Sequence, residues 1–64
     1  MSTDKTVAES VRQACLKAVL DAYESGGISG LCAEGRWELA VQAIRTLDLD
    51  EVLAEVQGHP NPTG

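Results

Sequence analysis

The stretch Arg36 to Leu47, RWELAVQAIRTL, decides the fold because it carries the one tryptophan of the chain and a clear helical pattern. At about 100° per residue its apolar side chains cover an arc of roughly 200°, and polar side chains occupy the remaining strip. The apolar side chains of this arc are Trp37, Leu39, Ala40, Val41, Ala43, Ile44 and Leu47. A helix with so wide an apolar arc requires burial on more than one side.

A second amphipathic helix is predicted upstream, over about residues 6–25. The segment from Thr6 to Glu9 (TVAE) fits a capping box, which predicts a helix start at Thr6. Apolar residues then recur at spacings of three and four as far as Tyr23. The sequence Ser25 to Gly27 (SGG) should end the helix, because glycine adopts the left-handed conformation without a Cβ clash.

The central helix is expected over about residues 30–47. Ser29 could cap a helix that runs straight into Trp37, or Gly35 could separate a single turn from the main helix. We favour Ser29 as the N-cap, with Gly35 inside a continuous helix. Close approach of the first helix would then compensate the cost of a helical glycine.

A third, shorter helix is expected over about residues 49–57. Asp48 and Glu51 fit a capping box of the Asp type, and acidic groups suit the positive end of the helix dipole. One narrow apolar stripe follows, and Gly58 should stop the helix. The stripe consists of Leu49, Val52, Leu53 and Val56.

The predicted fold class is all-α, a helical hairpin of residues 6–25 and 30–47 with the third helix laid across it. No stretch alternates apolar and polar residues over the length of a strand. We expect one three-helix domain over residues 6–58, a flexible N-terminus over residues 1–5 and a disordered, proline-containing tail over residues 59–64.

The small size of the chain favours a homodimer that forms a helical bundle. A 64-residue domain buries only about 60% of the surface of its unfolded chain, and the two longer helices have more apolar arc than one neighbour covers. The plain alternative is that the same side chains fill the core of a monomer. In either case we expect Trp37→Ala to cost about 3 to 5 kcal/mol. The candidate interface residues are Leu16, Leu20, Tyr23, Trp37, Leu39 and Val41.

The charge balance is acidic, with ten acidic residues against five basic ones and a net charge of −5. Such a chain repels phosphate backbones and anionic membranes, so we expect neither nucleic acid nor membrane as a partner. Two cysteines and the absence of a signal-peptide pattern favour the cytoplasm. Acidic residues in the third helix could dock a basic protein, although a solvated surface is the default. This acidic docking surface consists of Asp48, Asp50, Glu51 and Glu55.

Cys32 is the one candidate for a reactive group. It lies near the expected start of the central helix, where the helix dipole lowers a thiol pKa. Packing is the alternative role for Cys32 and also for Cys15, which lies on an apolar stripe. A disulfide between Cys15 and Cys32 stays open. The lone histidine, His59, has no ligand partner at a zinc-site spacing, so we expect no metal or cofactor.

These patterns favour a small noncatalytic helical module for protein–protein interaction or oligomerisation, with an acidic surface. A thiol-based redox or small-molecule-binding protein that uses Cys32 is the first alternative. An accessory subunit or antitoxin-like regulator is the second. No arrangement of residues in the sequence points to an enzyme.

Ending the chain after Gly58 should leave its stability unchanged, because the six residues beyond it have no apolar pattern to pack. Thermal unfolding of the full and shortened chains, followed by circular dichroism, measures this directly. A clear loss of stability on shortening would mean that the tail is docked.

Overall fold

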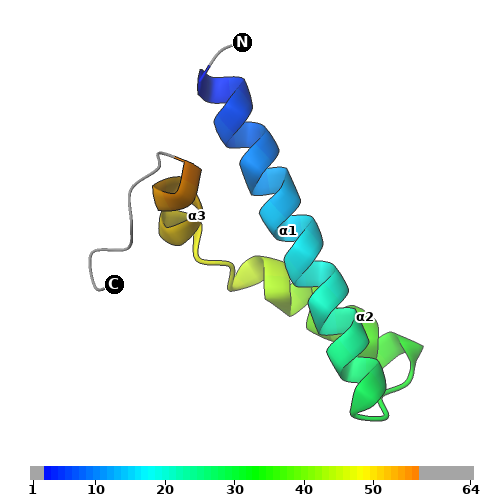
Figure 1. The fold of residues 1–64 in the computed structure, drawn as a ribbon. Coiled ribbons are helices and arrows are strands. Elements are labelled where there is room, and N and C mark those ends of the chain that lie inside the picture. The colour runs from blue at the N-terminus through cyan, green and yellow to red at the C-terminus, as the bar shows by residue number, and fades with distance from the viewer. Residues whose placement is uncertain (1–2, 57–64) are drawn as a thin grey trace. The chain divides into compact units, whose positions relative to one another are not determined.

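The computed structural model describes residues 3–56, and these residues form three α-helices and no strand (Figure 1). The helices are α1 (Thr3–Ile28), α2 (Ala33–Arg45) and α3 (Leu49–Val56). The predicted fold class is therefore confirmed: the chain is all-α, with a helical hairpin followed by a short third helix. The predicted helix stop at Gly58 and the predicted tail lie outside the described residues.

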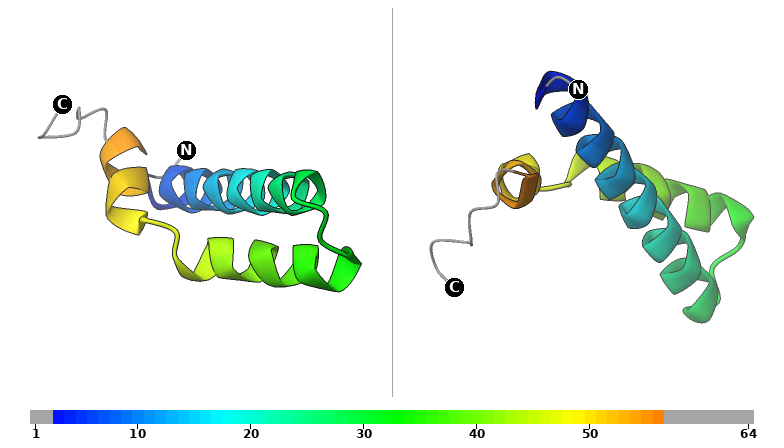
Figure 2. Two further views of the ribbon diagram at one scale, coloured as in Figure 1. Left: turned by 90° about the horizontal axis from the view of Figure 1, so that it is seen from below. Right: turned by 45° about the horizontal axis from the view of Figure 1, so that its top comes forward.

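The chain divides into two compact units, each of which contains part of α1. In the unit Cys15–Leu47, called the hairpin below, the second half of α1 and α2 lie side by side and run in opposite directions (Figure 2). The other unit joins residues 3–14 to residues 48–56. Its α3 buries Val52, and its part of α1 has three half-buried apolar residues. These are Val7, Val11 and Ala14.

The end of α1 differs from the prediction, because the helix passes through Gly26 and Gly27 and continues to Ile28. Gly30 has a φ of 85° and takes the left-handed position instead. The N–H of Gly30 donates to the carbonyl of Gly27 at 3.0 Å, and the N–H of Leu31 donates to that of Gly26 at 2.9 Å. This pair of bonds is a Schellman motif, which satisfies the last carbonyl groups of the helix.

Gly26 stays helical because α2 passes close to it. A methyl group at Gly26 would lie 3.1 Å from Leu39 Cδ1 and 3.5 Å from Arg36 Cα. Gly26 is also buried, although it has no side chain of its own. The approach of α2 therefore replaces the packing that a larger residue would give, and this offsets the conformational cost of glycine in a helix.

The start of α2 also differs from the prediction. Ser29 does not cap α2, because its N–H donates to the carbonyl of Ser25 at 3.0 Å and so belongs to the end of α1. The N-cap of α2 is Cys32, in an extended conformation with φ −70° and ψ 172°. The prediction that Gly35 lies inside a continuous helix is confirmed, but the predicted close approach of the first helix to it is wrong: the atoms nearest to a Cβ at Gly35 belong to Leu31, in the connection before α2.

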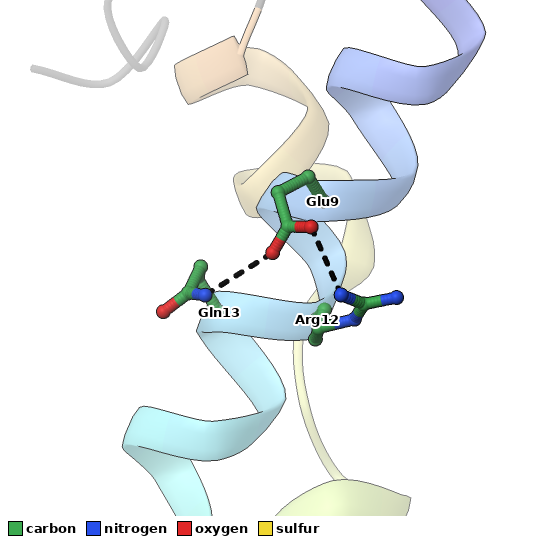
Figure 3. A network of polar contacts seen from close by, with 3 residues as sticks. All are labelled: Glu9, Arg12 and Gln13. Atoms are coloured by element: carbon green, nitrogen blue, oxygen red, sulfur yellow. Dashed lines mark hydrogen bonds and ion pairs between the residues drawn. The ribbon is translucent and has the colours of Figure 1, made fainter.

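The Asp48 cap of α3 is confirmed, whereas the Thr6 start of α1 is wrong. The Oδ1 atom of Asp48 accepts from the N–H of Glu51 at 3.1 Å. In α1 the helix begins at Thr3, inside the segment predicted to be flexible. Glu9 does not complete a capping box but accepts from the side chains of Arg12 and Gln13, both at 3.1 Å (Figure 3).

Replacing Gly30 by alanine should destabilise the chain by about 1 to 2 kcal/mol, because a Cβ is unfavourable at positive φ. The matched control is Gly30→Asn, which should cost less because asparagine tolerates the left-handed region. Urea unfolding followed by helical circular dichroism gives both free energies. Equal losses for the two variants would contradict the left-handed conformation of residue 30.

Candidate functional site

The hairpin carries two stripes of exposed apolar side chains, one on each helix. On α1 the stripe is Leu16, Leu20 and Tyr23, which share one side of the helix at spacings of four and three. On α2 the stripe is Trp37, Val41 and Ile44, with the same spacings in sequence. Water reaches 50% of Leu16, 58% of Leu20, 64% of Trp37 and 48% of Ile44, whereas Val41 is half-buried.

These side chains are exposed because each helix of the hairpin uses a different stripe to face its neighbour. On α2, Ala40 is only 2% exposed and Ala43 is half-buried. On α1, the half-buried residues are mostly small. They are Cys15, Ala18, Val19 and Ala22. The hairpin thus closes mainly through small side chains and Leu39, and five of its large apolar side chains lie to one side of the contact.

The two exposed stripes lie on the same side of the hairpin. Seen from the start of its own helix, each stripe lies roughly 100° clockwise of the stripe that faces the neighbouring helix. Because α1 and α2 run in opposite directions, equal rotations about their axes point to the same side. Together the stripes form one surface, called the apolar face below. Its members are Leu16, Leu20, Tyr23, Trp37, Val41 and Ile44.

Five of the six candidate interface residues from the sequence lie on the apolar face, and the structure places the sixth, Leu39, elsewhere. Leu39 is two positions and therefore about 200° around α2 from Trp37, and its Cδ1 atom packs at Gly26 of α1. The sequence argument assigned Ile44 to the apolar arc but did not include it among the interface candidates. The signal was present, since Ile44 follows Trp37 by seven residues.

Arg36 joins the two helices at the tip of the hairpin, a role that the sequence analysis missed. Its guanidinium carbon lies 5.3 Å from the centre of the Tyr23 ring, and its Nε donates to the carbonyl of Leu31 at 3.3 Å. A methyl group at Gly27 would lie 2.6 Å from the guanidinium, so the space above that glycine is already filled. Arg36 of α2 therefore contacts Tyr23 of α1 through a cation–π interaction.

Cys32 and Cys15 are both free thiols, so the hairpin contains no disulfide. Cys32 is exposed at the start of α2, whereas Cys15 is half-buried in α1. The backbone N–H of Gly35, followed by that of Glu34, lowers the pKa of the Cys32 thiol because these groups stabilise the thiolate. The Sγ atom of Cys32 makes no side-chain capping hydrogen bond in the structure.

The four acidic residues of the predicted docking surface are all exposed in or beside α3. Asp48 has a structural role, because its carboxylate caps the helix. Asp50 and Glu51 occupy the first turn, where negative charge is favourable at the positive end of the helix dipole. Part of this acidic character is therefore explained by the stability of α3 itself.

Within residues 3–56, no group of three or more histidine, cysteine, aspartate or glutamate side chains could hold a metal ion. Among the same residues, no helix combines the length and the apolar character needed to cross a bilayer. Comparisons with protein-family models, with curated proteins and with solved structures gave no match.

Cys32 should react with iodoacetamide at a lower pH than an ordinary thiol, because its lowered pKa gives more thiolate at a given pH. The measurement is the alkylation rate against pH for Cys15→Ser and Cys32→Ser, which leave one thiol each. The thiol that remains in Cys32→Ser, half-buried Cys15, should react more slowly. Equal rates and equal titration midpoints would contradict the stabilisation of the Cys32 thiolate.

Proposed function

We propose that the chain is a small noncatalytic interaction module that binds another protein surface through the apolar face of the hairpin. The observation that supports this most is that five of the eight large exposed apolar side chains of the hairpin gather on this one side, while Ile28, Leu31 and Leu39 are exposed elsewhere. Only Ala40 and Val52 are buried apolar residues among those that the structure describes. Most of the large apolar side chains are therefore exposed to water rather than buried within the fold.

The size of the face is consistent with this function. Its six side chains expose on the order of 600 Å², which is at the upper limit of the apolar patches that monomers usually carry and is typical of patches with a binding role. The whole chain exposes 5048 Å², so roughly one eighth of its surface is this face. Aliphatic and aromatic side chains bind but do not react, which is why we assign no catalytic role to the face.

The acidic surface belongs to the same proposal as a second site, separate from the apolar face, that would dock a basic protein. Negative charges on α3 and a net charge of −5 favour encounter with a basic protein and disfavour nucleic acid and anionic membranes. At the acidic surface, complementary charge would mainly raise the rate of encounter, whereas at the apolar face burial would contribute the free energy of binding. A cytoplasmic location is part of the proposal.

A thiol-based redox or small-molecule function at Cys32 is the second candidate. It is favoured by the exposure of this thiol and by its lowered pKa at the start of α2. Thiolate character and access are the two properties that make a cysteine reactive. The apolar face is the stronger candidate because it involves six residues from two helices, whereas the second candidate rests on one exposed thiol.

Leu20→Asp should abolish association, because it places a charge in the centre of the apolar face. Gln42→Asp is the matched control, since it adds the same charge at an exposed position of α2 outside the face. Sedimentation velocity measures self-association. Affinity purification from the native cell identifies other partners, and each complex is then reconstituted from purified proteins. Emission from the single tryptophan, Trp37, should shift to shorter wavelength when the face is covered.

Wild type and Gln42→Asp should form the same complexes, and Leu20→Asp should form none while keeping its helical circular dichroism. The proposal is wrong if Leu20→Asp retains every complex of the wild type. It is equally wrong if no complex forms with any of the three proteins by either method.

A further inference from the structure

We infer that the partner of the apolar face is a second copy of this chain, with α1 against α1 and α2 against α2 of the other copy, both pairs antiparallel. The two-fold axis passes near Leu20 of both copies and near Val41 of both copies. This inference rests on the proposed function, because it names the protein that covers the face. It is drawn from the charged side chains beside the face.

Charged side chains lie along the outer edges of the apolar face, and four of them, two on each helix, flank its centre. Glu34 lies on the same edge of α2, in the first turn and farther from the centre. Lys17 and Glu24 lie seven residues apart on α1, on the side of Leu20 away from α2. Glu38 and Arg45 lie seven residues apart on α2, on the side of Val41 away from α1. All four are exposed, and each helix carries one charge of each sign.

A two-fold axis perpendicular to the helices pairs these charges favourably. Each helix then runs antiparallel to the same helix of the second copy. Lys17 meets Glu24 of the second copy, and Glu38 meets Arg45 of the second copy. Because the axis repeats every contact, each pair forms twice. The Lys17 side chain now bonds Asp21 at 2.8 Å, but both groups are exposed, so exchanging partners costs little.

The other face-to-face arrangement places α1 against α2 of the second copy, with the axis parallel to the helices. The levels of the residues follow from the contacts of Gly26 with Arg36 and Leu39. Glu24 lies two residues before Gly26 and Glu38 lies two after Arg36, so these acids are level. Lys17 lies nine residues before Gly26 and Arg45 lies nine after Arg36, so these two bases are level as well. This arrangement would bring acid to acid and base to base, which is unfavourable.

The same levels show that one axis can serve both helix pairs. The midpoint of Lys17 and Glu24 falls between Leu20 and Asp21, and the midpoint of Glu38 and Arg45 falls just after Val41. Counted from Gly26 and Arg36 respectively, each midpoint lies between five and six residues from the tip of the hairpin. The two midpoints are thus level to within about one helical turn.

The area of the face agrees with a dimer of this kind. A stable dimer buries about 800 Å² on each partner. The apolar face supplies on the order of 600 Å², and the stems of the four charged side chains at its edges can cover the remainder. A small chain buries little apolar surface within its own fold, and self-association would bury more of it.

The test compares R45E, E38R and the double swap E38R/R45E by sedimentation equilibrium, with helical circular dichroism to verify folding. If the inference is correct, the wild type is a dimer and each single variant raises its dissociation constant by about tenfold, because like charges then meet twice. The double swap should restore the constant to near that of the wild type. Added salt should strengthen the R45E dimer more than the wild-type dimer, because it screens repulsive edge contacts in R45E and attractive ones in the wild type, while the net repulsion between acidic copies is screened in both.

Two results would overturn the inference. If R45E associates more tightly than the wild type, the new carboxylate has met Lys17, and α1 packs on α2 of the second copy. A dimer that forms through this face should be populated at roughly 200 µM. If the wild type is still monomeric at that concentration, the second copy is not the partner. In that case the proposed function still stands when Leu20→Asp loses a complex with a different protein that the wild type forms.

Discussion

Close packing of α2 on Gly26 is the constraint on which the hairpin depends. The absence of a side chain there lets Leu39 and the backbone of Arg36 approach α1 within normal contact distance. This contact fixes which stripe of each helix faces inward. Small residues complete the inward stripes, so the helices meet closely and enclose little apolar volume. Most of the larger apolar residues, Leu39 excepted, are left on the side that the contact does not cover.

Much of the fold could be predicted because two signals in the sequence have a single physical interpretation. The wide apolar arc of α2 requires a helix, and the carboxylate of Asp48 is placed to cap α3. The glycines were harder to interpret. Gly26, Gly27 and Gly30 are all able to end a helix, and only the position of α2 shows that the first two are needed for close packing. The end of α1 was therefore predicted too early and the start of α2 misplaced.

The candidate site was predictable in composition but less so in geometry. The surplus apolar arcs indicated that residues such as Trp37 and Leu20 would lack partners within one chain, and both are largely exposed. A cost of several kcal/mol for Trp37→Ala would therefore have to arise from association. Leu39 was grouped with them because an apolar arc alone does not show which part faces the neighbouring helix. The roles of Arg36 and Ile44 likewise depend on the rotation of α2, which the contact at Gly26 determines.

Affinity and arrangement have different physical origins at such a surface. Burial of the apolar face favours association whichever partner covers it, since hydrophobic attraction is not directional. The two face-to-face arrangements of a second hairpin would bury nearly the same side chains, so burial cannot select between them. The charges at the edges can select between the two arrangements. Along the chain, α1 carries the base before the acid (Lys17, Glu24), whereas α2 carries the acid before the base (Glu38, Arg45). One arrangement makes the contacts among these four charges attractive and the other makes them repulsive. Even weak exposed ion pairs then determine the geometry, because their sign is the main difference between two otherwise equal solutions.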